Sequence, residues 1–191
     1  FWGKSLFDGI VHLPLVLPPV AIGFALLVLF GRNGIIGAFL YQSFGIVFAF
    51  NWKGAALASA VMAFPLMVRA MRLSLEAVDQ RLEAAARSLG SSPWRVFATI
   101  TLPLTAPGIL TGAILGFARS IGEFGATITF VSNIPGQTRT LPVALYTLTQ
   151  IPGSDLPAWR LAGLSVALAL AALIGSEMLA RRMGQRLRGL D

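Results

Sequence analysis

The sequence predicts an all-α, polytopic membrane helix bundle, and two observations lead to that prediction. Hydrophobic residues make up 55% of the chain and charged residues only 12%, whereas soluble domains hold about 45–50% and about 25%. Several apolar runs also reach the roughly 20 residues that a helix needs to cross the hydrocarbon core of a bilayer. We therefore expect the 191 residues to form a single transmembrane domain in a lipid bilayer.

Four segments are long and apolar enough to span the membrane. They are residues 10–30, 54–73, 104–130 and 160–180. Residues 31–53 are expected to form a short interfacial helix, and 143–150 (VALYTLTQ) a short helix or re-entrant segment. Because the chain starts at Phe1 without a recognisable signal peptide, we expect that its natural N-terminus is missing, with one further span.

The basic residues predict an orientation. If the N-terminal end, residues 74–102 and the C-terminal tail share one side, that side carries ten basic residues and the other side four, with Arg119 inside a span. Basic residues gather on the cytoplasmic side, so residues 74–102 and the C-terminus are predicted to be cytoplasmic. The ten are Lys4, Arg69, Arg72, Arg81, Arg87, Arg95, Arg181, Arg182, Arg186 and Arg188.

The composition also argues against several functions. The net charge of +7 is interpreted as topological, because the basic residues form no stripe interleaved with aromatics that would indicate nucleic-acid binding. The chain has no cysteine and a single histidine, His12, so we expect no disulfide and no metal site. An intramembrane enzyme would need paired catalytic groups that the spans lack, and we expect no catalytic residue and no cofactor bound by this chain.

The predicted cytoplasmic segment, 75–103, has the pattern of two helices joined by a turn. Glu83 and Arg87 are spaced for an i,i+4 ion pair on the first helix. Gly90 suits the left-handed position after a helix end, while Ser92 can cap the next helix and Pro93 can occupy its first turn. The first helix is predicted to carry an apolar stripe of Leu75, Val78, Leu82, Ala85 and Leu89.

The second helix of this hairpin has its apolar face at Trp94, Phe97 and Ile100, and Pro103 leads into the third span. Two interpretations are open. An amphipathic loop could rest on the membrane surface, but such a helix gains most by being continuous. A helix–glycine–helix corner instead makes a protrusion suited to a groove on a cytoplasmic partner.

The hairpin resembles the cytoplasmic loop of permease subunits from binding-protein-dependent ABC importers. Their pattern is EAA, three residues, Gly, nine residues, Ile, one residue and Leu-Pro. Gly90, Ile100 and Leu102–Pro103 match its second half. The first half of the pattern does not match. Counting back from Gly90 places its Glu at Ala84, while Glu83 lies one residue earlier.

Four longer segments are similar to molybdate permeases. They are VHLPLVLPPV (11–20), AFPLMVRA (63–70), PWRVFATITLPLT (93–105) and FARSIGEFGATITFVSNIPGQTRTLP (117–142). Sulfate and thiosulfate permeases are similar in the last segment, so these anions and tungstate remain alternative substrates. A secondary transporter would need a coupling-ion site and inverted repeats, neither of which is evident; a membrane scaffold subunit also remains open.

The resemblance implies a homodimeric permease of the bacterial inner membrane, whose two copies form the path for an oxyanion. An external binding protein would deliver the anion, and two cytoplasmic ATP-binding subunits would bind ATP, for which this chain has no GxxxxGK[ST] loop. The residues that the resemblance assigns to docking on the ATP-binding subunit are Glu83, Ala84, Ala85, Ala86, Arg87, Leu89, Gly90, Ser91, Ser92, Pro93 and Trp94.

The third predicted span contains charged residues, which are costly in a bilayer at about 2.5–3.5 kcal/mol on insertion scales. Arg119 and Glu123 are four residues apart, so they are expected to share a helix face. The favoured interpretation is a structural pair or gate support, since Glu123 cancels much of the attraction of Arg119 for an anion. The alternative is a translocation path lined by Arg119, Ser120, Glu123 and Thr127.

Overall fold

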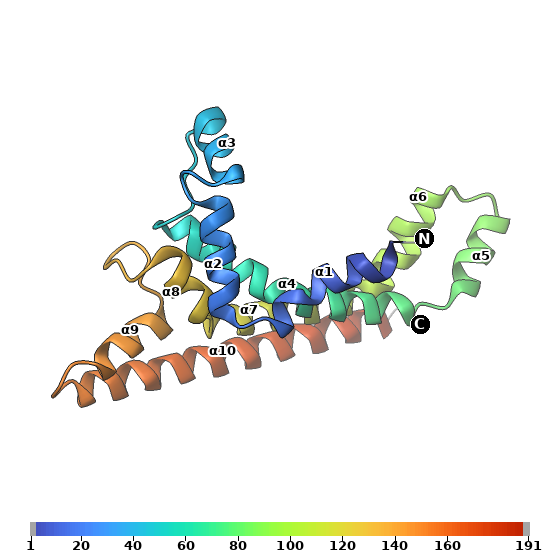
Figure 1. Cartoon of the computed structure of the whole chain (residues 1–191). Coiled ribbons are helices and arrows are strands. Elements are labelled where there is room, and N and C mark those ends of the chain that lie inside the picture. The colour runs from blue at the N-terminus through green and yellow to red at the C-terminus, as the bar shows by residue number, and fades with distance from the viewer. Residues whose placement is uncertain (1–2, 189–191) are drawn as a thin grey trace. The chain divides into compact units, whose positions relative to one another are not determined.

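The computed structural model describes residues 3–188, and in the last helix it describes side chains only up to 175 and at 177 and 178. Over this range the regular structure is entirely helical, without a strand (Figure 1), as the sequence predicts. Two compact units are present: residues 1–65 with 117–170, and residues 66–116 with 171–191. The side chains of the basic tail, Arg181, Arg182, Arg186 and Arg188, lie outside those described.

In the first unit, the first predicted span is two helices rather than one. Helices α1 (Lys4–Val16) and α2 (Pro19–Phe30) meet at a bend of 116° (Figure 1). Leu17 is extended (φ −73°, ψ 144°) because a residue before proline is pushed out of the α region, and neither Pro18 nor the proline after it can donate a helical hydrogen bond. The described residues thus contain three spanning helices, or four if this pair counts as one span.

The core of the first unit forms where α2 packs against α8 (Gly125–Val131). Its buried members are Ile22, Leu26, Ala49, Ala58, Met62, Ala126, Phe130 and Val131. The two short helices expected between the spans are confirmed as α3 (Ile35–Phe44) and α9 (Leu141–Thr149). This core holds α8 in place, and the Ala126 N–H of α8 donates to the buried carboxylate of Glu123.

The second predicted span is confirmed, and the bounds of the third are wrong. The third begins at Pro93 and ends at Ile121, whereas residues 125–131 form the separate helix α8. It begins early because α6 (Pro93–Val96), the π-helical turn η1 (Phe97–Thr101) just before Pro103 and α7 (Leu102–Ile121) run on as one continuous helix. The other long helices are α4 (Trp52–Glu76) and α10 (Asp155–Arg188). The fourth span lies at Asp155–Gly175 of α10, a few residues earlier than the predicted 160–180.

In the second unit, the end of α4 and the start of α7 are in direct contact. A side chain added at Gly108 would overlap Ser74, and one added at Gly112 would reach 3.0 Å from the Met67 carbonyl oxygen. The Ser74 hydroxyl also donates to the Thr105 carbonyl at 3.4 Å. The two helices therefore form a close-packed base, and α5 (Gln80–Ser88) and α6 lie on the chain that connects them (Figure 1).

Candidate functional site

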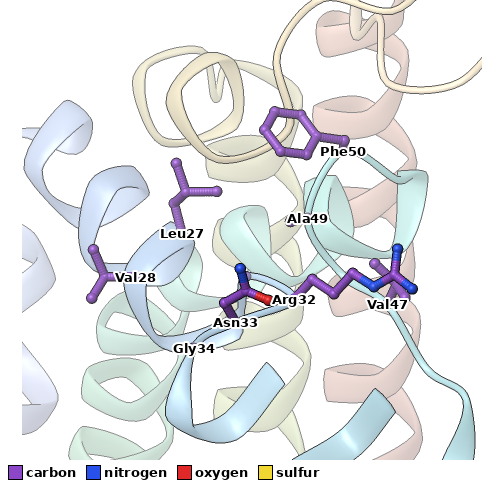
Figure 2. A pocket seen from close by; sticks show the side chains of 9 residues that line it. Leu27, Val28, Arg32, Asn33, Gly34, Val47, Ala49 and Phe50 are labelled. Atoms are coloured by element: carbon purple, nitrogen blue, oxygen red, sulfur yellow. The ribbon is translucent and has the colours of Figure 1, made fainter. Parts of the chain in front are cut away.

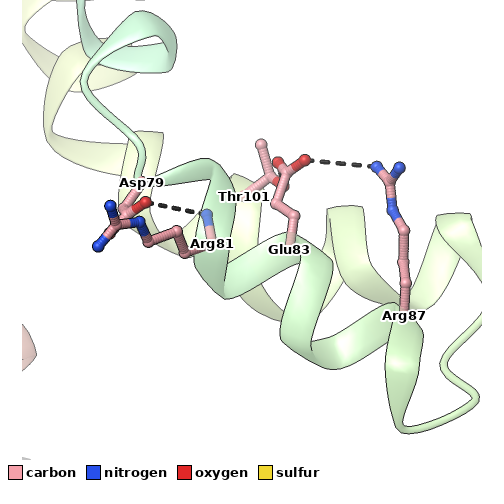
Figure 3. Close-up of polar contacts among 5 residues, drawn as sticks. All are labelled: Asp79, Arg81, Glu83, Arg87 and Thr101. Carbon is pink, nitrogen blue, oxygen red and sulfur yellow. Dashed lines mark hydrogen bonds and ion pairs between the residues drawn. The ribbon is translucent and has the colours of Figure 1, made fainter.

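The hairpin begins with a capped helix, α5, which starts later than the sequence predicts. The Asp79 carboxylate accepts the Arg81 N–H at 2.9 Å and so caps the helix (Figure 3). The predicted apolar stripe is thus split, because Leu75 belongs to α4 and Val78 to the connecting turn. The hairpin consists of the short helix α5 and the first turns of a membrane-spanning helix, against which α5 packs.

The end of α5 has the geometry that the sequence predicts. Gly90 has φ +83°, and no atom lies within 4 Å of the Cβ position there. The Gly90 N–H donates to the Arg87 carbonyl at 3.0 Å, and the Ser91 N–H to the Ala86 carbonyl at 3.1 Å. These two bonds define a Schellman motif, which ends the helix and turns the chain sharply. Gly90 is therefore required by its backbone conformation rather than by lack of space.

The next helix starts with the predicted cap. The Ser92 hydroxyl accepts the Arg95 N–H at 3.4 Å, and Pro93 occupies the first turn. The rings of Trp94 and Phe97 stack with centroids 5.6 Å apart. Stacking over one turn stiffens the exposed side of this helix.

The corner between α5 and α6 presents large apolar side chains to the outside of the chain. Leu89 is 86% exposed and Trp94 is 76% exposed, although Val96 next to them is buried at 1%. Exposed aromatic and aliphatic side chains at a rigid corner are typical anchors for a partner pocket. Of the other predicted docking residues, Ala86 and Ser91 are half-buried and the rest, apart from Glu83, are exposed.

Glu83 is the member of the predicted set that faces inward. Its Oε1 accepts a hydrogen bond of 2.6 Å from the Thr101 hydroxyl, and its Oε2 lies 3.4 Å from Arg87 Nη2 (Figure 3). The ion pair with Arg87 is the i,i+4 contact predicted from the sequence. The contact with Thr101, 18 residues away, has no local sequence signal, and sequence reasoning missed it.

An open groove of about 630 Å³ runs along α5 on the side of the turn that precedes it. Charges of both signs line it, together with two apolar side chains from the end of α4 and the turn. Its lining is Leu75, Glu76, Val78, Gln80, Arg81, Glu83, Ala84 and Arg87. The formal charges of the two glutamates and two arginines in this lining cancel, so the groove lacks the net charge that would favour a free ion.

A second group of predicted residues meets where α7 ends and α8 begins. Arg119 Nη1 lies 2.7 Å from Glu123 Oε2, and the Glu123 side chain is 1% exposed. The other oxygen of Glu123 accepts the Ala126 N–H at 2.8 Å, and the Thr127 hydroxyl donates to the Phe124 carbonyl at 2.8 Å. The predicted ion pair is present, with Glu123 in the break between the helices rather than inside a span.

This geometry leaves little at the break for an anion to bind. Thr127 is completely buried and its hydroxyl is used inside the chain, while the Ser120 carbonyl accepts the Glu123 N–H at 3.2 Å. The Arg119 charge is compensated by a carboxylate that is itself anchored to α8. The arrangement is that of a structural joint, in which one carboxylate connects two helices.

A third feature, which the sequence did not single out, is a pocket of about 500 Å³ at the turn between α2 and α3. Figure 2 shows Leu27 and Phe50 on its walls and the Arg32 guanidinium extending beside Val47. That guanidinium donates to the Tyr41 hydroxyl at 2.8 Å and lies 4.5 Å from the centre of its ring. The cation is thus held by an aromatic partner. Within residues 3–188 no cluster of His, Asp and Glu suited to a metal ion occurs.

Comparison with known proteins places these features in context. Residues 1–185 match the family model described as "Binding-protein-dependent transport system inner membrane component". The molybdenum transport system permease protein ModB of Escherichia coli K12 is 64% identical over 186 residues, which are 97% of this chain and 81% of that protein. The protein of the same name from Haemophilus influenzae is 61% identical over 98% of this chain and 82% of its own length.

Among solved structures, a chain of the methionine ABC transporter MetNI in an inward-facing conformation has a similar fold. The TM-score is 0.61, with 95% of this chain and 93% of that chain covered. At 15% sequence identity, this likeness concerns the fold alone. It agrees with the helical, multi-pass architecture described above.

Proposed function

This chain belongs to the family of binding-protein-dependent transport system inner membrane components, and we propose that it is the permease subunit of an ATP-driven molybdate importer. The assignment of molybdate as the substrate rests on the 64% identity to a molybdenum transport permease over 97% of the chain. Tungstate, sulfate and thiosulfate have the same tetrahedral oxyanion chemistry, so they are the alternatives that an experiment must separate from molybdate.

In this proposal the chain itself does not hydrolyse ATP. Two cytoplasmic subunits bind ATP, an external protein delivers the oxyanion, and two copies of this chain enclose the path. The hairpin and the C-terminus face the cytoplasm, as the distribution of basic residues favours. The apolar corner at Leu89 and Trp94 supports a docking role, because large side chains presented at a turn outside the predicted spans can insert into a partner pocket.

The base of the hairpin supports a mechanical role. Gly108 of α7 lies against Ser74 of α4, and Gly112 of α7 against Met67 of α4. At this distance the side chains prevent the two helices from sliding past each other. A force applied at the corner is therefore passed to both helices together. Rigid-body rocking of helices is an established mode of alternating access, and a hairpin on a close-packed base acts as a short lever for it.

The Arg119–Glu123 pair has a supporting role in this scheme. It stabilises the break between α7 and α8 and so positions α8 within the first unit. We assign these residues to gate support rather than to direct contact with the anion, because the carboxylate compensates the cation. Ser120 and Thr127 are assigned to the same joint.

The test uses proteoliposomes that contain the chain with its ATP-binding subunit, supplied with the external binding protein. We expect ATP-dependent uptake of molybdate that exceeds sulfate uptake at equal concentration by about tenfold or more, a difference of roughly 1.4 kcal/mol in recognition. Uptake of sulfate in preference to molybdate would contradict the substrate, whereas uptake without the ATP-binding subunit would contradict the mechanism.

A separate test addresses docking. The ATP-binding subunit should co-purify with the chain, and deletion of residues 84–94 should abolish this while the spans remain folded by circular dichroism. If the subunit remains bound after the deletion, the docking assignment is wrong.

A further inference from the structure

The contact between Glu83 and Thr101 connects α5, the short helix of the hairpin, to the start of the spanning helix. The Glu83 side chain is only 25% exposed and Thr101 is 5% exposed. One carboxylate oxygen is bonded to Thr101 at 2.6 Å and the other lies 3.4 Å from Arg87, so both oxygens of Glu83 have contacts inside the hairpin. It therefore differs from the exposed residues of the corner.

Thr101 behaves unlike the other threonines of this helix. Thr99, Thr105 and Thr111 each donate to the carbonyl four residues earlier in their own helix, at 2.7, 2.9 and 2.9 Å. That local bond is the usual one for a helical threonine. The Thr101 hydroxyl instead donates to Glu83, across the hairpin. The Thr101 hydroxyl therefore forms a contact between two helices in place of the usual bond to a backbone carbonyl of its own helix.

The π-helical turn is what directs Thr101 toward Glu83. In η1 the Leu102 N–H donates to the Phe97 carbonyl, five residues back. This wider turn adds one residue, so the positions after it are offset by about 100° from a straight α-helix. Val96 and Thr101 accordingly share the buried side, at 1% and 5% exposure, although a straight helix would place residues five apart about 140° from each other.

The π-helical turn lies just before Pro103 and accommodates this proline. The ring of Pro103 would collide with the carbonyl of Thr99 in a regular α-helix, and it has no N–H to donate to that carbonyl. Widening the preceding turn relieves the collision without breaking the helix. The π turn thus accommodates Pro103, and it also places Thr101 within reach of Glu83.

We infer that Glu83 and Thr101 form a brace that sets the angle between α5 and the spanning helix, and that this brace is required for ATP-driven movement to reach the membrane. The inference rests on the proposed coupling role of the hairpin. It assigns Glu83 to the inside of the hairpin, as a positioning residue, and leaves docking to the exposed corner. Without the brace, α5 stays attached to the partner but turns about its connections, and the lever loses stiffness.

The brace can be measured directly with spin labels, because the sequence has no cysteine. Labels on Ser88→Cys and Ala113→Cys report the position of α5 relative to α7 in the full chain in lipid nanodiscs. We expect a narrow distance distribution for the parent and for Thr101→Ser, which keeps the donor, and a clearly broader one for Thr101→Val. The matched control is Thr99→Val, which removes a hydroxyl bonded only within its own helix and should leave the distribution narrow.

The same variants are then assayed in the complete transporter. Thr101→Val should keep the ATP-binding subunit and its ATP hydrolysis while the number of oxyanions moved per ATP falls, because loss of one charge-assisted bond lowers the ratio of braced to unbraced hairpins by about tenfold. An unchanged distance distribution in Thr101→Val, or a serine variant as broad as the valine, overturns the brace. A broader distribution with unchanged transport per ATP overturns its role in coupling.

These outcomes are distinct from failure of the proposed function. If no ATP-binding subunit binds the parent chain, the transport proposal is wrong, and the spin-label distances still decide whether the brace exists.

Discussion

Glu123 and Arg119 are joined by a contact of 2.7 Å in which the carboxylate is almost fully buried, at 1% exposure, and the guanidinium is 28% exposed. The second oxygen of Glu123 accepts the Ala126 N–H at 2.8 Å. One side chain therefore neutralises the cation of α7 and caps the first turn of α8. Removing Arg119 leaves the buried carboxylate without its cation, and removing Glu123 takes an acceptor from the Ala126 N–H, so this pair is a sensitive point for the stability of the first unit.

The first prediction concerns this pair. Arg119→Met should lower the free energy of unfolding by about 3–5 kcal/mol, the range for breaking a buried pair, because the almost fully buried Glu123 side chain loses its cation. Glu123→Gln should cost less, since its carbonyl oxygen can still cap α8. Thermal unfolding in nanodiscs gives the order of the two variants. A glutamine variant less stable than the methionine variant would contradict the view that the charge, rather than the cap, dominates.

The second prediction concerns the exposed corner. Trp94→Ala should weaken binding of the ATP-binding subunit by about 30-fold, the effect of losing an interface hot spot of roughly 2 kcal/mol. Trp159 in α10 is a matched control because its exposure, 76%, equals that of Trp94. Titration calorimetry on the chain in nanodiscs measures both affinities. Equal losses for Trp159→Ala and Trp94→Ala would show that the effect is general to exposed tryptophans and would refute docking at the corner.

Local patterns in the sequence predicted the local parts of this hairpin. Gly90 after the helix end, Ser92 as a cap and the i,i+4 pair of Glu83 with Arg87 all depend on neighbours within one or two turns. The contact of Glu83 with Thr101 depends instead on how far the chain turns between these two residues. The spacing of apolar and polar residues in the sequence does not predict that turn. Pro103 was the available signal for the π turn, since a proline inside a continuous helix requires some local change.

The spans show the same division between local and non-local information. Apolar length predicted α4 and the membrane-spanning part of α10, because hydrophobicity is a local property. The bend at Leu17 was missed although the adjacent prolines indicate it, since the whole run is apolar. At the break before α8, the Glu123 carboxylate accepts the Ala126 N–H and pairs with Arg119. The apolar length of the segment does not predict this arrangement.

The third prediction separates backbone conformation from space at Gly90. A Cβ at Gly90 or at Gly163 would meet nothing within 4 Å, yet only Gly90 has a positive φ, +83°. Gly90→Ala should therefore destabilise the hairpin by about 1–2 kcal/mol, and Gly90→Asn by less, because asparagine tolerates this region. Gly163→Ala, in a helix, should be neutral or stabilising by up to about 1 kcal/mol.

Hydrogen exchange of the amides in α5 measures the expected effect on the hairpin. Faster exchange in Gly90→Ala, with Gly90→Asn near the parent, supports the left-handed turn as the element that ends α5. If alanine and asparagine exchange at the same rate as the parent, the positive φ does not contribute to the stability of the corner.

The fourth prediction concerns the base of the lever, where Gly108 of α7 lies against Ser74 of α4. A Cβ at Gly108 would overlap the Ser74 side chain, and the next neighbour is the Ala70 carbonyl at 3.2 Å. Gly108→Ala should therefore cost about 1–3 kcal/mol by overpacking, although alanine is the better helix former. Adding Ser74→Gly removes the overlapping atoms and should recover most of the stability, despite the lower helix propensity of glycine in α4. Thermal unfolding of the parent, the two single variants and the double variant gives the stabilities for a double-mutant cycle. If the two changes are simply additive, α4 and α7 are not in contact at this point, and the rigid base on which the coupling argument depends is absent.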